Sequence, residues 1–200
     1  MTRSRLPAGC VVVGVDGSEH ALRATTWAAH QASLERRPLA LVHSADQMVL
    51  RETAWLDRQG LDREELTRAF SAAGRATLDA ACEQAQLAAP EVTVLTELVD
   101  IDPRDALVDR SEHSHAVVVG SRGRGPLRTA LLGSVSASVT RRARCPVIVC
   151  RPRDERPATH PRVLVGADGA AASRPVLEYA FAQASLRELP PESSPDRGER

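Results

Sequence analysis

Lysine and asparagine are both absent from this 200-residue sequence, so arginine is the sole side chain with a permanent positive charge. The lack of lysine excludes a phosphate loop of the Walker A type and Schiff-base chemistry, because both need a lysine amine. Aromatic side chains make up only 2% of the chain, so valine, leucine and alanine must build its core. The formal net charge of +0 argues against broad attraction to nucleic acid or to an anionic membrane.

Long apolar runs are missing as well. None approaches the roughly 20 residues that a membrane-spanning helix needs, and the first residues lack the apolar stretch of a signal peptide. Cysteine pairs of the CxxC type are also absent, so we expect free thiols in a reduced compartment. These features predict a cytoplasmic protein, with four unpaired cysteines at Cys10, Cys82, Cys145 and Cys150.

Short apolar runs alternate with segments of helical periodicity. Strands buried on both faces are expected over residues 10–15, 39–44, 92–99, 116–120 and 146–150. Helices are expected over 18–36, 62–86, 103–112 and 134–142, with residues 46–61 as a variable loop. This alternation predicts an α/β fold with a doubly wound five-stranded parallel sheet of order 3-2-1-4-5. Ligands gather at the switch point of such a sheet, here between the first and fourth strands.

Particular side chains refine this prediction. Ser18 and Ser134 have the chemistry of N-caps for the first and last of these helices. The helix from Asp62 has a set of residues with the spacing of one core-facing stripe: Leu66, Phe70, Ala73, Thr77, Leu78 and Ala81.

The C-terminal part of the chain repeats its beginning. Residues 163–169 (VLVGADG) match residues 11–17 (VVVGVDG), and the match continues without gaps to Pro38, which returns as Pro190. An internal duplication is the natural interpretation. We expect one domain over 1–151, a Pro-rich linker over 152–161, an incomplete second repeat of one strand and one helix over 162–189, and a disordered tail over 190–200.

The incomplete repeat raises a question of its own. One strand and one helix cannot bury a core alone. We therefore expect residues 162–187 to be mobile or docked on a neighbouring sheet. What the strand pairs with stays open.

A glycine-rich turn lies between the fourth strand and the last helix. Glycines let the backbone turn tightly and bring its N–H groups close to a phosphate. The following helix, from Ser134, presents unpaired N–H groups and a partial positive charge to an anion. Arg122, Arg124 and Arg128 add full positive charges. This chemistry predicts phosphate binding.

The turn also fits a longer pattern, G-x2-G-x9-G-[S/T], with Gly120, Gly123, Gly133 and Ser134. Together with the GVDGS turn, the LVH and CPVIV strands and the LLGSVS segment, it resembles the ATP-binding branch of the universal stress proteins over residues 9–151. The repeat resembles tandem members whose second copy is cut short. The resemblance implies a flavodoxin-like or adenine-nucleotide-alpha-hydrolase-like fold, ATP or AMP binding, a role in stress response and a homodimer through the last strand.

Carried over by position, the resemblance implies an ATP site built from three segments. Gly123 and the backbone at Arg124 would meet phosphate, and the start of the last helix would hold it. The end of the first strand would line the ribose or adenine, where Asp16 is able to reach Mg²⁺ or a hydroxyl. Ser44 replaces a valine that the family often has beside adenine. The expected binding residues are Gly14, Val15, Asp16, Ser44, Gly120, Ser121, Arg122, Gly123, Arg124, Gly125, Gly133, Ser134, Val135 and Ser136.

Several polar residues have a structural alternative. Asp16 could satisfy only the donors of its own turn, and Ser134 could be only a helix cap. His43 is interpreted as a packed core histidine, and His113 and His115 as solvated. Asp168 repeats Asp16 without a partner loop and is not expected to form a site.

Three functions compete. We favour a nucleotide-dependent binding module, because we find no dedicated general base and no paired carboxylates to hold Mg²⁺. No catalytic residue is therefore expected. The alternatives are a weak ATPase and a dimeric scaffold that binds no nucleotide. Nucleic acid and membranes are not expected as partners.

Overall fold

The computed structural model describes residues 6–45, 63–123, 132–152, 162–168 and 170–189. The chain divides into two compact units, residues 1–152 and 153–200. The expected loop over 46–61, most of the expected linker and the expected tail over 190–200 lie outside the described residues.

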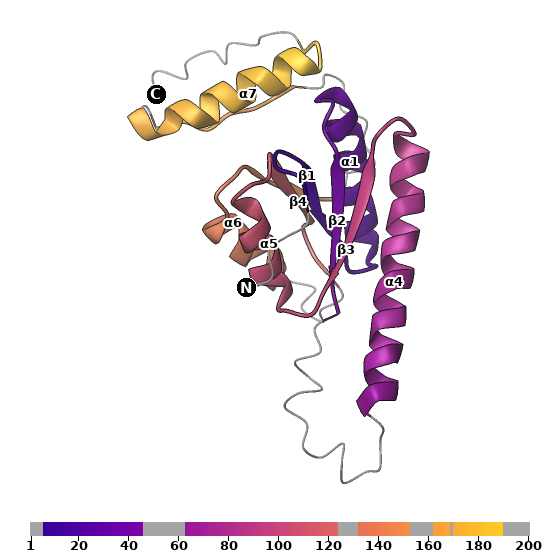
Figure 1. Cartoon of the computed structure of the whole chain (residues 1–200). Helices are drawn as coiled ribbons and strands as arrows, with labels where there is room; N and C mark the ends of the chain where they lie inside the picture. The colour runs from indigo at the N-terminus through magenta and orange to yellow at the C-terminus, as the bar shows by residue number, and fades with distance from the viewer. Residues whose placement is uncertain (1–5, 46–62, 124–131, 153–161, 169, 190–200) are drawn as a thin grey trace. The chain divides into compact units, whose positions relative to one another are not determined.

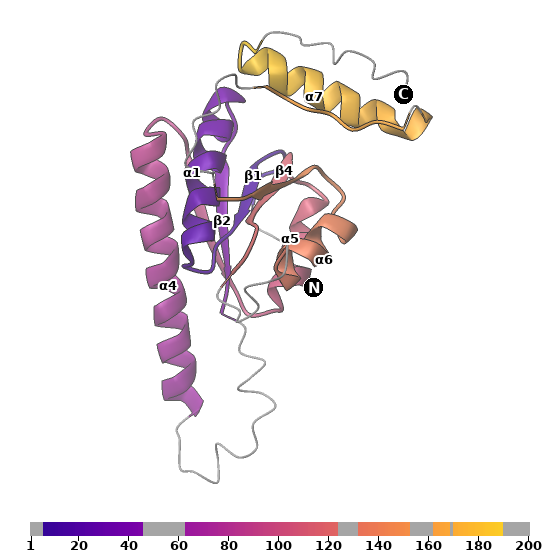
Figure 2. The ribbon, with the colours of Figure 1, turned by 180° about the vertical axis from the view of Figure 1, so that it is seen from behind.

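Unit 1 (residues 1–152) is built around one parallel sheet. Its strands are β1 (Val11–Gly14), β2 (Leu39–Ser44), β3 (Val94–Val99), β4 (Ala116–Gly120) and β5 (Val147–Cys150). Its helices are α1 (Glu19–Leu34), α4 (Arg63–Ala88), α5 (Pro103–Ser111) and α6 (Ser134–Arg142). The strand order is β3-β2-β1-β4-β5, which confirms the predicted topology. Helices α1 and α4 cover one face of the sheet, and α5 and α6 cover the other (Figure 1 and, from behind, Figure 2).

The central strand β1 shows why its sequence is a continuous apolar run. β1 is paired on one side with β2 and on the other with β4. Val11 and Val13 pack in the core beneath α1 and α4, whereas Val12 packs with Leu107 of α5 and Val139 of α6. Successive side chains of a strand point to opposite faces, and both faces of this one are covered. All three valines are completely buried.

Side-chain caps fix the starts of two helices. The Ser18 hydroxyl accepts a hydrogen bond from the Ala21 amide at 3.2 Å, which confirms the predicted cap of α1. Asp102, which was not predicted, caps α5 by accepting a bond from the Arg104 amide at 2.7 Å. The side-chain hydrogen bond from Arg104 lowers the pKa of Asp102 to about 2, so the cap stays charged at neutral pH.

The start of α6 differs from the prediction. The N-cap of α6 is Gly133, which makes no side-chain capping bond, and Ser134 is the first helical residue. The prediction of Ser134 as the cap was therefore wrong by one position. A glycine is acceptable there because its backbone can still leave the helix in the extended conformation that a cap needs.

Helix α4 is longer than the sheet that it covers, and this corrects the predicted core stripe. The helix has 26 residues and is about 39 Å long, whereas six-residue strands such as β2 span about 20 Å. Its first half overhangs the strands (Figure 1), and Phe70 and Ala73 are exposed there. The buried stripe runs through Leu78, Ala81 and Ala85 instead.

Gly74 lies where α4 first meets the sheet. A Cβ atom at Gly74 would lie 2.7 Å from Leu98 Cδ1 and 3.0 Å from His43 Cδ2. The glycine therefore permits the close approach of α4 to β2 and β3. Helix propensity alone would predict only that this glycine destabilises the helix.

The fold defines the environment of His115 and of the four cysteines. His115, predicted to be solvated, is half-buried, and its Nε2 lies 2.9 Å from the Glu35 carboxylate. All four cysteines lie within the described residues and are free thiols, as predicted. Burial raises the pKa of Cys145 and of Cys150 to about 11, so both are neutral near pH 7.

Unit 2 (residues 153–200) consists, where it is described, of a segment over 162–168, a short 3-10 helix η1 (Ala171–Ser173) and the helix α7 (Arg174–Leu186). The strand expected at the start of the repeat over 162–189 is not formed in the described residues 162–168, because the described residues of this unit offer no second strand to pair with it. Leu164 is accordingly 87% exposed. Within the described ranges of the whole chain, no helix combines the length and apolar content needed to cross a bilayer.

Candidate functional site

A cleft of about 800 Å³ opens where β1 and β4 end, at the switch point of the sheet. Its volume falls within the range of ordinary small-molecule sites. Most of the expected binding residues line it: Gly14, Val15, Asp16, Ser44, Gly120, Arg122, Gly123, Gly133, Ser134, Val135 and Ser136. Ser121 is almost completely buried and is not part of the lining, and Arg124 and Gly125 lie outside the described residues.

The sequence did not indicate the rest of the lining. These residues come from α1, β2, α5 and the ends of the glycine-rich turn: His20, Ala21, Val42, His43, Pro103, Ala106, Leu107, Val119 and Leu132. The contribution of α5 had a signal that could have been used. Pro103 starts a helix directly after β3, and helices that follow parallel strands begin at the same edge of the sheet.

Two hydrogen bonds shape the glycine-rich turn. The Gly133 amide donates to the Ser121 carbonyl at 2.8 Å and so brings the two ends of the turn together. The Ser136 hydroxyl donates to the Gly120 carbonyl at 2.6 Å and ties the first turn of α6 to the end of β4. These bonds bring the amino end of α6 to the cleft. The first amides of a helix have no acceptor within the helix, so this end attracts an anion.

The three described glycines of the turn, Gly120, Gly123 and Gly133, are not equivalent. A Cβ atom at Gly120 would lie 2.8 Å from the backbone of His20, and one at Gly123 would lie 2.5 Å from Asp16 Oδ2. At Gly133 the nearest atom would be Arg122 Cα at 3.5 Å, which is an ordinary contact distance. Packing within the protein therefore demands the first two glycines but does not demand the third.

One carboxylate oxygen of Asp16 satisfies a donor of its own turn, which was the alternative interpretation of this residue. Its Oδ1 accepts a hydrogen bond from the Ser18 amide at 2.9 Å, within the turn between β1 and α1. Its Oδ2 is the atom that a side chain at Gly123 would strike. The carboxylate thus lies between the helix start of α1 and the glycine-rich turn, at the border of the cleft.

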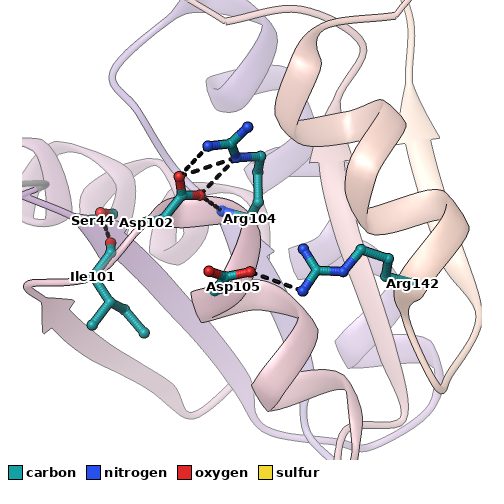
Figure 3. A network of polar contacts seen from close by, with 6 residues as sticks. All are labelled: Ser44, Ile101, Asp102, Arg104, Asp105 and Arg142. Atoms are coloured by element: carbon teal, nitrogen blue, oxygen red, sulfur yellow. Dashed lines mark hydrogen bonds and ion pairs between the residues drawn. The ribbon is translucent and has the colours of Figure 1, made fainter.

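The carboxyl end of β2 is fixed by contacts from both sides. His43 Nδ1 lies 2.7 Å from the Val15 carbonyl. A carbonyl only accepts, so Nδ1 carries the proton. The Ser44 hydroxyl donates to the Ile101 carbonyl in the connection between β3 and α5 (Figure 3). His43 is therefore packed, as predicted, but its ring also contributes to the cleft wall.

Helix α5 supplies an apolar wall that ion pairs hold in place. Arg110 donates to both carboxylate oxygens of Glu97 on β3, at 2.7 and 2.8 Å. Asp105 forms an ion pair with Arg142 of α6 at 2.9 Å, next to the capping pair Asp102–Arg104 (Figure 3). These contacts position Pro103, Ala106 and Leu107 against the cleft. An apolar wall facing a polar turn suits a ligand that has a ring at one end and negative charge at the other.

Comparison with known proteins identifies the family of this chain. The model of the universal stress protein family matches residues 10–151. The chain belongs to the universal stress protein family. The match covers unit 1 almost completely and includes every strand of the sheet.

Two universal stress proteins of Mycobacterium tuberculosis strain H37Rv are among the relatives. One is 37% identical over 188 residues, covering 90% of this chain and 60% of that protein. The other is 37% identical over 191 residues, covering 94% of this chain and 63% of that protein. The chain therefore spans about three fifths of the length of these curated relatives.

Solved structures share the fold. A universal stress protein from Lactobacillus plantarum superposes with a TM-score of 0.61 at 24% identity, covering 74% of this chain and all of that one. A universal stress protein solved in complex with cAMP has a TM-score of 0.52 at 26% identity, covering 73% of this chain and 98% of that one. The parallel sheet with its 3-2-1-4-5 order is thus the universal stress protein fold, of the adenine-nucleotide-alpha-hydrolase-like type.

Proposed function

We propose that the cleft at the ends of β1 and β4 binds ATP, and that the protein is a nucleotide-dependent regulatory module in stress response. The observation that carries this proposal is the glycine-rich turn, which is closed by the bond from Gly133 to Ser121 and leads directly into α6. The complex of a family member with cAMP supports an adenine nucleotide as the class of ligand.

The two sides of the cleft fit the two parts of such a ligand. The adenine ring would lie along the apolar wall of α5 and the ends of β1 and β2, near Val15 and Ser44. The phosphates would meet the amides of the turn and of the first turn of α6, together with Arg122. Asp16 would meet a ribose hydroxyl, or a Mg²⁺ ion that the phosphates themselves also bind.

Gly133→Ala is the sharpest test, because packing leaves room for it. The added methyl group would lie 3.7 Å from the Gly123 amide nitrogen, at ordinary contact distance, and would cover an amide that we expect to bind phosphate. We expect a loss of stability of no more than about 1 kcal/mol, because alanine is a poorer N-cap than glycine, and an ATP affinity lower by about tenfold or more, since hydrogen bonds to charged groups are strong. Isothermal titration calorimetry measures the affinity.

The matched control is Gly166→Ala, because a Cβ atom at Gly166 would have no neighbour within 4 Å. We expect this variant to bind ATP like the wild type. Equal ATP affinity in Gly133→Ala and the wild type would contradict the proposed phosphate site. Gly123→Val is a weaker test, since a side chain at Gly123 also strikes Asp16.

The alternatives make different predictions in the same assay. Release of inorganic phosphate from bound ATP, lost in Gly133→Ala, would support a weak ATPase. Absence of any ATP binding by the wild type would support a scaffold.

We also propose that the protein forms homodimers through β5. This strand ends the sheet, so one of its edges has no partner strand among the described residues of unit 1. Sedimentation of Val149→Pro measures this, because a proline removes a backbone donor. We expect the dimer of the wild type to dissociate in the variant, and an unchanged sedimentation coefficient would contradict the proposal.

We further propose that unit 2 is an incomplete second copy of unit 1. The matching turn and helix of the two units support it. The relatives are longer than this chain, which leaves room in them for a complete second copy.

A further inference from the structure

His20 is a cleft residue that neither the sequence pattern nor the proposed function uses. It is the second residue of α1, is half-buried and lines the cleft. An imidazole in this position has two ring nitrogens that can serve a ligand or a neighbour.

The structure holds His20 in place from two sides. Its Nδ1 lies 3.4 Å from the Ser121 hydroxyl, at the first position after β4. Its backbone lies so close to Gly120 that a Cβ atom there would come within 2.8 Å of the His20 carbonyl carbon. The glycine-rich turn and the first turn of α1 are thus in direct contact. Since Nδ1 faces Ser121, Nε2 is the ring nitrogen that can meet a ligand.

The charges around this ring explain why a further donor is useful. Asp16 places a carboxylate at the same border of the cleft, which opposes the binding of a phosphate. Among the described residues of the turn, Arg122 supplies the opposing positive charge. Glu19 and Arg23 of α1 pair with each other at 3.3 Å. The opposite wall, from α5, is apolar where it lines the cleft.

We propose that His20 contacts a phosphate of the nucleotide through Nε2 and that Ser121 is the positioning residue that orients its ring. The inference rests on the proposed function, since it needs a nucleotide in the cleft. It adds a ligand from α1 on the side of the phosphates opposite α6. It predicts that His20 distinguishes phosphorylated ligands from the bare nucleoside.

The experiment compares two ligands on the full chain. Isothermal titration calorimetry with ATP and with adenosine, both in EDTA, is carried out on the wild type and on His20→Asn, whose shorter amide keeps a polar group near the position of Nδ1 but none at the position of Nε2. We expect the ATP affinity of His20→Asn to be about tenfold lower, and the adenosine affinity to be unchanged, because adenosine has no phosphate. His113→Asn is the matched control, since His113 is exposed and is not part of the cleft lining. It should bind both ligands like the wild type.

Ser121→Ala keeps the inference testable if His20→Asn does not fold. It leaves the imidazole in place but removes the hydroxyl beside Nδ1, and we expect a smaller loss of ATP affinity with no loss for adenosine. In a double-mutant cycle the effect of Ser121→Ala should vanish when His20 is already replaced.

The outcomes separate this inference from the proposed function. Equal ATP affinity in His20→Asn and the wild type, or equal losses for ATP and adenosine, would overturn the role of His20 and leave nucleotide binding standing. Absence of ATP binding by the wild type would overturn both. Full ATP affinity in Ser121→Ala would overturn the positioning role.

Discussion

The two copies of one sequence motif fold differently in the two units of this protein. In unit 1 the residues 11–14 form β1, paired on both sides and buried. In unit 2 the matching residues 163–166 pair with no strand among the described residues of that unit, and Leu164 is exposed. The sequences are almost the same, so the difference arises from what surrounds them.

The residues around the turn and the helix that follows are similar in the two units, although the helical segment of unit 2 begins with the 3-10 helix η1, whereas α1 is α-helical from Glu19. Ser18 and Ala170, at matching positions, have backbone angles of φ −78°, ψ 157° and φ −75°, ψ 156°. Asp16 and Asp168 each accept a bond from the amide two residues on, at 2.9 and 3.0 Å. Arg36 and Glu188 end the helices with φ values of 51° and 52°.

The comparison separates two kinds of information. A turn and a helix satisfy their hydrogen bonds within a few neighbouring residues, so the same residues reproduce them in any context. A strand has its hydrogen-bonding partners elsewhere in the chain, and it forms only where they are present. Substitutions at matching positions of the two copies test this distinction.

Val12→Asp against Leu164→Asp should give the largest difference. Val12 is completely buried, so a carboxylate there should lower the free energy of unfolding by about 4 kcal/mol or more. Leu164 is 87% exposed, and its substitution should change that quantity by less than about 0.5 kcal/mol. Urea unfolding followed by circular dichroism measures both. A comparable loss at Leu164 would show that this segment is paired in solution.

Gly14→Ala against Gly166→Ala should give the next largest difference. A Cβ atom at Gly14 would lie 2.8 Å from the buried Leu107 Cδ1, whereas one at Gly166 would meet nothing within 4 Å. We expect Gly14→Ala to destabilise unit 1 by about 1–3 kcal/mol because the core must shift. Gly166→Ala should be neutral or slightly stabilising. The same urea titration measures both changes in the free energy of unfolding. Equal changes in the two variants would contradict the difference in packing.

Ser18→Ala against Ala170→Ser tests whether a cap can be transferred. Loss of the Ser18 hydroxyl, which accepts from the Ala21 amide, should cost about 1 kcal/mol. A serine at position 170, the N-cap of η1, should add the corresponding cap and increase the exchange protection of the amides of η1 and of the start of α7 by about fivefold. Hydrogen exchange measured by NMR follows the amides of both units. Unchanged protection of η1 and of the start of α7 would mean that the geometry alone is not sufficient for capping.

Arg36→Gly and Glu188→Gly should give the smallest effects, and of the same sign. Both residues have the left-handed conformation that glycine adopts most easily. Each substitution should stabilise its own helix by up to about 1 kcal/mol. Thermal unfolding reports on unit 1 and hydrogen exchange on α7. Effects of opposite sign would contradict a purely local origin of these helix ends.

Much of the fold of unit 1 could be predicted from the sequence, and its errors have a pattern. The strand order was confirmed because buried apolar runs and right-handed crossovers leave few topologies. Phe70 was wrongly assigned to the core because helical periodicity does not reveal that α4 is longer than the strands. The cap at Asp102 was missed although the predicted start at Pro103, a residue that favours the first helical position, places Asp102 at the N-cap.

The residues of the candidate site also differ in whether the sequence alone reveals them. The glycine-rich turn was visible because its residues are close together in the chain. His20, His43 and the wall of α5 were missed because they reach the cleft through packing between separate elements. Periodicity and spacing along one segment carry no signal of such contacts.

The sequence by itself determined the aspartate bonds after residues 11–14 and 163–166 and the helix ends, in both copies, because the atoms that satisfy them are only a few residues apart. It also determined the family, through the glycine spacing that precedes α6. Only the tertiary structure decided that residues 11–14 become a strand, that Gly120 must be a glycine because α1 lies against it, and that His20 reaches the cleft. Each of these depends on atoms that the fold brings together from distant parts of the chain.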